Sequence, residues 1–315
     1  MTVQSKRFKV KPDTVGRMRW NIAISFTVFL IATILITSYG SVSVSGWSNG
    51  GYSSNPANPD YGTHDWIAQH ALDWLPQQEK QFLTDNLASY LYGTELPDNN
   101  QASDKIGDTT KHHVYYSATE VMVDDAAAVR AREEYALAVD LYRAGNRTEA
   151  AKHLGAMVHY VSDVAVFGHV MGASTAWGAE VHHSDYEDYV QTRTDSYTDE
   201  FNSFLTYDGA LVTTSAYDAA RMLAYDTTFD TDGDLTCVWM DTHYSWSNSA
   251  FRSRAGESLN LAVNLVADVL HTFYSEGVVP EFPGWVILPL FLLATLLVVL
   301  VSRKTAIRTS RRLAV

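Results

Sequence analysis

Apolar residues recur at the three- and four-residue spacing of an amphipathic helix through most of the chain between residues 63 and 274. The stripe is clearest in HDWIAQHALDWL, which Thr63 can cap at its N-terminus, and in the last such segment, 249–274. Between them, helical spacing covers a segment that reaches Gly93 and four later stretches, 119–142, 148–167, 181–204 and 215–228. No stretch alternates persuasively in the manner of a strand. The pattern predicts an all-α domain, a multi-helix bundle of about seven to nine helices with its functional site between them.

Two longer apolar runs lie outside this region, one near each end of the chain. The first, 22–36, follows a cluster of basic residues and precedes small residues, which is the layout of a secretory signal peptide or signal anchor. Cleavage after Gly46 would make Trp47 the first residue. The second run, 285–302, follows PEFPG, precedes a basic tail and reaches the short end of the length range of membrane-spanning helices. Because both runs carry basic residues on the sides facing the termini, both termini are predicted in the cytoplasm and the segment between the runs outside the cell.

These features divide the chain into five predicted segments. They are a signal peptide or signal anchor (1–46), an extracellular domain (47–275), a linker with a sorting motif (276–284), a transmembrane helix (285–302) and a basic cytoplasmic tail (303–315). The PEF sequence, the apolar run and the basic tail together resemble an archaeal C-terminal sorting signal, which implies that the span is either retained or replaced by a lipid anchor. The sequence therefore predicts a protein of the cell membrane whose main domain lies on the outer side.

Composition narrows the chemistry of this domain. With 46% hydrophobic residues in a chain of 315, it can bury a sizeable core. The single cysteine, Cys237, excludes an internal disulfide and a thiolate-rich metal site. The two ends hold 11 of the 23 basic and 3 of the 36 acidic residues, so 47–275 retains 12 basic and 33 acidic residues and a net charge of −21. A domain this acidic repels polyanions, so broad nucleic-acid binding is not expected, although bound metal ions can reverse the field locally.

Ligand-type side chains gather in residues 153–187, HLGAMVHYVSDVAVFGHVMGASTAWGAEVHHSDYE. The pairs His159/Asp163 and His183/Glu187 are each four residues apart, so on a helix each pair shares one face. His169 follows the first pair, whose neighbours are mostly apolar. A buried helix carries imidazole and carboxylate together at a high cost unless a cation neutralises them. A lone histidine on such a helix is more often a hydrogen-bonded core residue, but two pairs and a further histidine favour a metal site held by nitrogen and oxygen.

A second acidic motif, Asp230-Thr-Asp232-Gly-Asp234, has the look of a calcium loop. It lacks the full ligand register and the terminal glutamate of such loops. We therefore interpret it as an acidic surface turn, with calcium binding as the alternative.

Laid out in chain order, the candidate ligands resemble the superfamily that contains zinc-dependent phospholipase C and the single-strand nucleases. The most specific matches are HYVSDVAVFGH, with the spacing His-x3-Asp-x5-His, and HHSDYE, with the spacing His-x3-Glu. The resemblance implies an all-α domain over 47–275 with a trinuclear zinc site between its helices, and at least two of the three ions. The ligand residues that it implies are Trp47, His64, Asp98, His113, His159, Asp163, His169, His183 and Glu187.

The resemblance also distributes these ligands among the ions. One zinc takes His169, His183 and Glu187, and a second takes Asp98, His113, His159 and Asp163. The third ion shares Asp163 and adds His64 and the amine and carbonyl of the mature N-terminal residue, here Trp47.

This sequence departs from the family pattern in two places near the ligands. His112 is an alternative to His113, because both stand in the same loop. The proline usually found between the aspartate and the following histidine is absent, and Val166, Phe167 and Gly168 stand there instead.

These residues predict a zinc-dependent phosphodiester hydrolase. Two adjacent metal ions can hold a phosphodiester, lower the pKa of a water and stabilise the leaving alkoxide, and Asp98 is the residue predicted to orient or deprotonate the attacking water. With its anchor and acidic surface, the protein is predicted to hydrolyse phospholipid head groups at the outer face of the membrane. One alternative is a single-strand nuclease of the same fold, for which Trp177, Trp239 and Trp246 could supply a base-stacking pocket. Another is a non-catalytic metal-binding surface protein.

Overall fold

The computed structural model describes residues 53–99, 106, 108–278, 289 and 291–298. The chain divides into two units, Met1–Val44 and Ser45–Val315, of which only the second contains described residues. The predicted signal segment, Trp47 and the basic tail lie outside the described residues, as do most of the linker with the sorting motif and half of the predicted span. In the part of that span that is described, residues 291–298 are helical and exposed. Among the helices of the described residues, none has the length and apolar character needed to cross a membrane.

The described part of the second unit is mostly helical with almost no strand, which confirms the all-α prediction. Between residues 63 and 273 its α-helices are α2 (Thr63–Trp74), α3 (Gln77–Asp85), α4 (Leu87–Glu95), α5 (Ala126–Arg143), α6 (Arg147–Ser162), α7 (His183–Gln191), α8 (Ala216–Phe229), α9 (Cys237–Thr242) and α10 (Ser249–Phe273). Shorter turns are the 3-10 helices η1 (Asp163–Ala165), η2 (Phe167–His169) and η3 (Glu200–Phe204) and the π-helical η4 (Tyr274–Val278). One small antiparallel hairpin, β1 (Tyr115–Tyr116) and β2 (Met122–Asp124), joins the loop after α4 to α5.

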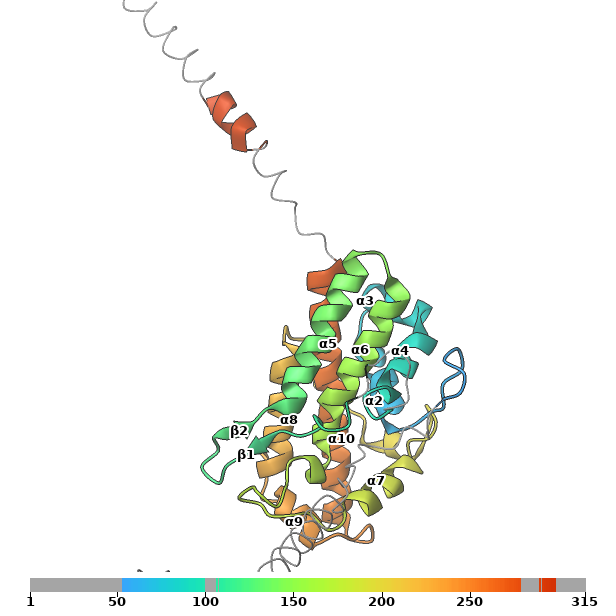
Figure 1. Ribbon diagram of the computed structural model, residues 1–315, viewed down its shortest axis with the longest axis vertical. Coiled ribbons are helices and arrows are strands. Elements are labelled where there is room, and N and C mark those ends of the chain that lie inside the picture. The colour runs from blue at the N-terminus through green and yellow to red at the C-terminus, as the bar shows by residue number, and fades with distance from the viewer. Residues whose placement is uncertain (1–52, 100–105, 107, 279–288, 290, 299–315) are drawn as a thin grey trace, which may run out of the picture. The chain divides into compact units, whose positions relative to one another are not determined.

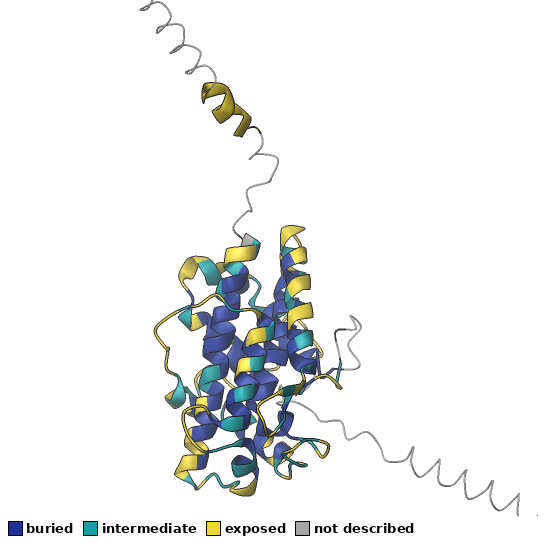
Figure 2. Ribbon diagram, turned by 90° about the vertical axis from the view of Figure 1, so that its left-hand side faces the viewer, coloured by how far each residue is buried: buried dark blue, intermediate teal, exposed yellow. Residues whose placement is uncertain are grey.

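Helix α6 lies at the centre of the bundle, with α5 and α4 packed along it and α8 and α10 close by (Figure 1). Its central and C-terminal residues, from Leu154 to Ser162, are all buried. Long helix α10 buries the predicted stripe, which includes Leu259, Val263 and Val266. Figure 2 shows that buried residues follow the facing sides of the helices, while exposed residues collect on their outer sides and in the connecting loops.

Two glycines let α4 and α6 approach until their backbones touch. A Cβ atom on Gly155 would lie 2.0 Å from the carbonyl oxygen of Tyr90, and one on Gly93 would lie 2.0 Å from the carbonyl oxygen of Lys152. Any side chain at either position would therefore push the helices apart. This close contact brings the C-terminal turn of α4 against the face of α6 that carries His159.

Three predicted helices are shorter than their apolar patterns suggested. The stretch 119–142 begins with the β1–β2 hairpin, whose turn puts Glu120 at φ 61° and pairs Ser117 N–H with the Val121 carbonyl; the α-helix starts only at Ala126. The stretch 148–167 stops being α-helical at Ser162 and continues as two 3-10 turns.

The stretch 181–204 ends its helix at Gln191. Side chains there bind the last free carbonyls, since Thr194 Oγ1 donates to Val190 O and Arg193 Nη1 donates to Tyr189 O. Conversely, α9 lies between the predicted stretches 215–228 and 249–274, where no helix was predicted. Capping by polar side chains decides these boundaries, and helical spacing alone does not reveal it.

Candidate metal centre

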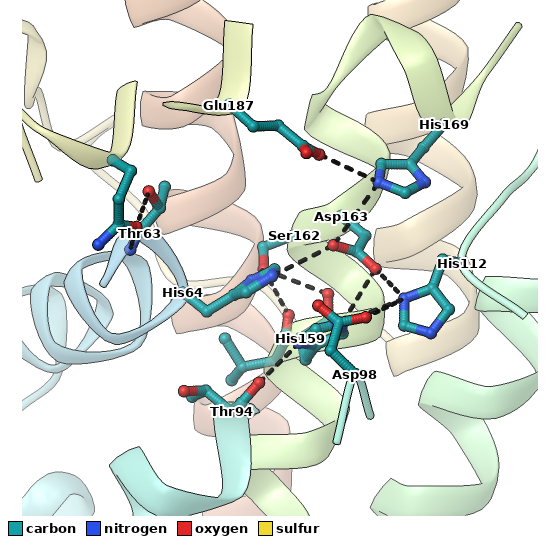
Figure 3. Close-up of polar contacts among 12 residues, drawn as sticks. Thr63, His64, Thr94, Asp98, His112, His159, Ser162, Asp163, His169 and Glu187 are labelled. Carbon is teal, nitrogen blue, oxygen red and sulfur yellow. Dashed lines mark hydrogen bonds and ion pairs between the residues drawn. The ribbon is translucent and has the colours of Figure 1, made fainter. Parts of the chain in front are cut away.

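The centre is built on the C-terminal end of α6. His159 lies in its last turn and Asp163 follows its last residue, so the four-residue spacing places both side chains on one face. His159 Nε2 is 3.1 Å from Asp163 Oδ2, and both side chains are completely buried. This is the arrangement that the sequence predicted for the first pair (Figure 3).

Three side chains from other segments converge on this pair (Figure 3). His64, from the first turn of α2, places Nε2 3.2 Å from Asp163 Oδ1. His112, from the loop before β1, places Nδ1 against Asp163 Oδ2. Asp98, which follows α4, places Oδ1 3.6 Å from His112 Nδ1 and 3.8 Å from His159 Nε2. Segments separated by about a hundred positions thus meet around one carboxylate.

A second cluster adjoins the first and comes from η2 and α7. His183 and Glu187 lie one turn apart on α7, with His183 Nε2 2.8 Å from Glu187 Oε1. His169, the last residue of η2, places Nε2 3.4 Å from the same oxygen. It also lies 4.0 Å from Asp163 Oδ1, so it connects the two clusters. All three side chains are buried.

Outer hydrogen bonds fix which ring nitrogen of two histidines faces the centre. His159 Nδ1 donates to the carbonyl oxygen of Thr94 at 2.6 Å, which leaves Nε2 pointing inward. His112 is turned the other way, because its Nε2 donates to the carbonyl oxygen of Asp108 at 2.6 Å and Nδ1 points inward. Metal-binding histidines are characteristically held by such an outer bond, which fixes the tautomer and the ring orientation.

His64 is fixed in the same way by a side chain of α6. Its Nδ1 donates to Ser162 Oγ at 2.7 Å, because that hydroxyl itself donates to the carbonyl oxygen of Val158. Among the described residues, His64 Nε2, Asp163 Oδ1 and His169 Nε2 are buried polar atoms with no hydrogen-bond partner. Buried polar atoms nearly always have partners, so three unsatisfied atoms around one point indicate a place for a cation.

In the first cluster, neighbouring charges shift the pKa values of Asp163 and His112 in opposite directions. Burial opposes ionisation of Asp163, but the imidazoles of His159, His169 and His112 outweigh it and hold the pKa of that carboxyl well below its usual range. Burial also disfavours the charged form of His112, yet the nearby carboxylates of Asp163 and Asp98 raise its pKa to about 9.

Burial and neighbouring charges also shift the pKa values of His64, Asp98 and His183. Burial, with the neighbouring His159, lowers the pKa of His64 to about 3. Burial raises the pKa of the Asp98 carboxyl. Burial works against the charged form of His183, but Glu180 and Glu187 raise its pKa to about 10. Without a cation, the centre therefore holds protons on some histidines to balance its carboxylates.

Within the described residues, three groups bring their ligand atoms within 4.8 Å of one another: His64, His159 and Asp163; Asp98, His112 and His159; and His169, His183 and Glu187. Imidazole nitrogen and carboxylate oxygen are the donors that zinc takes when thiolates are absent. The residues present therefore fit zinc.

Of the predicted ligands inside the described residues, His113 alone does not join the centre. Its Nε2 pairs with Asp124 Oδ2 at 3.2 Å, and its ring stacks on Tyr115 with centroids 4.4 Å apart. The neighbouring His112 takes the place expected for it. Sequence reasoning also did not find Thr94 and Asp108. Both act through their backbone carbonyl groups, which every residue has, so the residue type gives no signal.

The three tryptophans considered as base-stacking residues are engaged in packing. Trp246 stacks on Tyr189 with ring centroids 3.8 Å apart. Trp177 Nε1 donates to the carbonyl oxygen of Tyr116 at 2.7 Å, and Trp239 stacks on His243.

The first aspartate of the acidic motif at 230–234, Asp230, lies beside a buried arginine. Arg254 is almost completely buried, and its Nη2 donates to Asp226 Oδ2 at 2.8 Å. Its Nε lies 3.6 Å from Asp230 Oδ1, while Asp230 Oδ2 accepts from Leu235 N–H. The guanidinium thus places a positive charge beside Asp226 and Asp230, and residues 231–233 of the motif are exposed in a turn.

Comparison with known proteins places the chain in a family. Residues 63–235 match the family described as zinc dependent phospholipase C. No curated protein matches the chain. The solved alpha toxin of Clostridium absonum is similar at 18% identity and a TM-score of 0.46, over 71% of this chain and 65% of that one. An alpha-toxin of Clostridium perfringens from an avian strain is similar at 17% identity and a TM-score of 0.44, over 75% of this chain and 68% of that one.

The matched region covers more than half of the chain, so this protein belongs to the zinc-dependent phospholipase C family. Membership confirms the predicted resemblance to zinc-dependent phospholipase C. The chain spans 65% of the length of the first alpha toxin.

Proposed function

We propose that this protein is a membrane-anchored zinc-dependent phosphodiesterase that hydrolyses phospholipid head groups on the outer side of the cell membrane. The observation that carries the proposal is the position of Asp163. Its Oδ2 faces His112 and His159, and its Oδ1 faces His64 and His169. A carboxylate whose two oxygens face separate histidine pairs is suited to bridge two cations.

The proposed ligand set follows from this arrangement. The first zinc takes Asp98, His112, His159 and Asp163, and the second takes His169, His183 and Glu187. A third takes His64 and Asp163 and is completed by the amine and carbonyl of Trp47, so three ions are proposed, with two as the minimum. When bound, zinc would act as a Lewis acid on the phosphodiester and lower the pKa of an attacking water.

Asp98 is proposed as the residue that orients the attacking water and accepts its proton. It lies at the edge of the first cluster, between His112 and His159, and its side chain is nearly buried. Burial raises its pKa, which makes its carboxylate a better proton acceptor than an exposed one. The hydrogen bond from His159 Nδ1 to Thr94 O fixes the orientation of the His159 ring beside Asp98.

A lipid substrate is favoured over a nucleic acid by charge and by packing. The domain 47–275 carries a net charge of −21, which repels a polyanion at long range. Trp177, Trp239 and Trp246 are occupied by contacts within the domain. The anchor itself is proposed from the sequence: a signal segment before Trp47 and a span at 285–302.

The test uses the full chain in detergent, assayed on bis-p-nitrophenyl phosphate, phosphatidylcholine vesicles and single-stranded DNA. We expect hydrolysis of the first two, loss of that activity on chelation and its return with zinc. Asp98→Asn should lose most of the activity even at saturating zinc, because the amide cannot accept the proton of the attacking water. Cleavage of DNA without cleavage of lipid would support the nuclease alternative. Zinc-loaded protein that hydrolyses none of the three would support a non-catalytic metal-binding protein.

A further inference from the structure

We infer that Asp241 is a positioning residue for the zinc site formed by His169, His183 and Glu187, and that Gly168 provides the space for the His183 ring. The inference rests on the proposed function, because it assumes that these three residues hold zinc. Neither Asp241 nor Gly168 is itself a ligand in this cluster.

Asp241, on α9, binds the backbone just before α7 from a distant part of the chain. Its Oδ1 accepts from the N–H of Val181 at 2.9 Å and from the N–H of His182 at 3.0 Å. The same oxygen is 3.2 Å from His182 Nδ1. Both N–H groups precede the first residue of α7, which has no side-chain cap at His182, so Asp241 fixes the backbone that leads into the helix.

The backbone held by Asp241 leads directly into the turn that carries both α7 ligands. His183 is the first residue of α7, and Glu187 lies one turn later. Of the residues just before α7, Val181 is 75% exposed, while the His182 side chain is 34% exposed and its ring stacks on Tyr244. The Asp241 side chain, in contrast, is only 8% exposed. Its two backbone hydrogen bonds therefore set where α7 begins and in which direction His183 points.

Helix α9 also packs against η2, which carries His169 as its last residue. One short helix thus contacts both segments that contribute to this cluster. It places His169 relative to the start of α7, so that His169 Nε2 and His183 Nε2 face the same Glu187 oxygen.

Gly168 sets the remaining distance between η2 and α7. A Cβ atom on Gly168 would lie 2.5 Å from His183 Cγ and 2.6 Å from His183 Nδ1. Any side chain at this position would have to displace the imidazole ring. The glycine is needed for space, and it lies directly before His169, so a shift there moves two ligands at once.

The test measures zinc per chain by mass spectrometry, after dialysis of the full-length protein in detergent against increasing chelator. We expect Asp241→Ala to lose one zinc at a chelator concentration about 10- to 100-fold lower than wild type, the usual effect of removing an outer partner of a metal site, while the other ions remain. Asp241→Asn should be intermediate, because its amide oxygen can still accept. Asp185→Asn is the matched control, since it removes the same charge from an exposed position in the first turn of α7. It should retain zinc as wild type does.

Gly168→Ala should lose the same ion selectively, with Gly277→Ala as its control, because a methyl group there meets only ordinary contacts with Phe273. The inference would be overturned if Asp241→Ala lost zinc only at the chelator concentration at which Asp185→Asn loses it. Loss of all ions together would also overturn it. Should Asp241→Ala not fold, the comparison of Asp241→Asn with Asp185→Asn decides in the same way. A wild-type protein that retains no zinc would overturn the proposed function instead.

Discussion

His112 and Asp163, 51 positions apart, meet at the centre with His112 Nδ1 2.5 Å from Asp163 Oδ2. The contact ties the loop before β1 to the end of α6. Because His112 Nε2 is held by the carbonyl of Asp108, the ring has one orientation, and the next residue, His113, points elsewhere to Asp124.

The two neighbouring histidines should therefore respond very differently to substitution. His112→Ala should weaken zinc binding by at least the 10- to 100-fold that loss of an outer partner typically costs. His113→Ala should retain zinc and change the free energy of unfolding by no more than about 0.5 kcal/mol, as is usual for a partly exposed residue in a surface ion pair. Zinc titration and thermal unfolding of both variants check this. Equal zinc loss in the two variants would contradict the proposed ligand set.

Metal removal should destabilise the protein, because the centre joins α2, α6, η2 and α7. A ligand that binds only the folded state at 100 times its dissociation constant adds about 2.7 kcal/mol. Chelation should therefore lower the melting temperature, and zinc should restore it. His159→Ala and Asp163→Ala should melt early and respond less to chelator and zinc than the wild type, because only the ligand group His169, His183 and Glu187 is left unchanged in both. A wild-type melting temperature that is indifferent to chelator would argue against a metal at this position.

The pH dependence of stability should differ between the metal-free and zinc-loaded proteins. In the metal-free form the pKa of His112 is raised to about 9 and that of His183 to about 10, above the value of about 6.5 for an unfolded histidine. Stability from their protonated forms is fully present below pH of about 6.5 and is lost as pH rises through these folded-state pKa values. Zinc needs the neutral imidazole, so its binding strengthens over the same interval.

We therefore expect the melting temperature of the metal-free protein to fall between pH 6.5 and 9, and the gap to the zinc-loaded protein to widen. His64 does not interfere in this window, because its pKa is lowered to about 3 and it opposes folding only below pH of about 6.5. His112→Gln is the control: it removes one titrating group and should flatten the metal-free curve. A gap that stays constant with pH would show that these protons do not compete with the metal.

The contact of α4 with α6 should matter for zinc as well as for stability. Gly155→Ala introduces a methyl group 2.0 Å from the Tyr90 carbonyl, and relieving such a clash costs typically about 1–3 kcal/mol. Moving α4 outward also withdraws the Thr94 carbonyl from His159 Nδ1. Chemical denaturation and zinc titration should both show a loss, and Gly277→Ala should show neither. Unfolding that becomes easier without weaker zinc binding would mean that Thr94 is not needed to orient His159.

Sequence reasoning succeeded where one local pattern was sufficient. The pairs His159/Asp163 and His183/Glu187 follow from helical spacing, because one turn of helix already brings their side chains together. It could not decide between His112 and His113, because that choice depends on which way an irregular loop turns its residues.

Residues that act across the fold were also beyond the reach of spacing. Asp241 meets Val181 only through tertiary packing, 60 positions away along the chain. Glu95, one residue after Thr94, is a further case: it accepts three hydrogen bonds from Ser53. Neither contact leaves a periodic signal, since both join segments that are remote in sequence.

The contact between Ser53 and Glu95 limits how far Trp47, six positions earlier, can lie from the end of α4. Ser53 N–H is bound to both oxygens of Glu95, and its hydroxyl donates to Oε2 at 2.8 Å. The segment before α2 is thus held at the end of α4, beside the carbonyl that binds His159. Six positions separate Trp47 from Ser53, and an extended chain covers about 3.3–3.6 Å per residue, so a free Trp47 amine has about 20 Å of reach.

We predict cleavage between Gly46 and Trp47, because an amide nitrogen inside an uncut chain is a very poor zinc ligand whereas a free amine is a good one. N-terminal sequencing of protein isolated from its native membrane should begin Trp-Ser-Asn, and that protein should hold one more zinc than a variant with an uncut N-terminus. Trp47→Ala, cleaved at the same bond, should keep the extra zinc, since the ligand atoms belong to the backbone. Native protein that still begins near Met1 would remove Trp47 from the ligand set and reduce the proposed centre to two ions around Asp163.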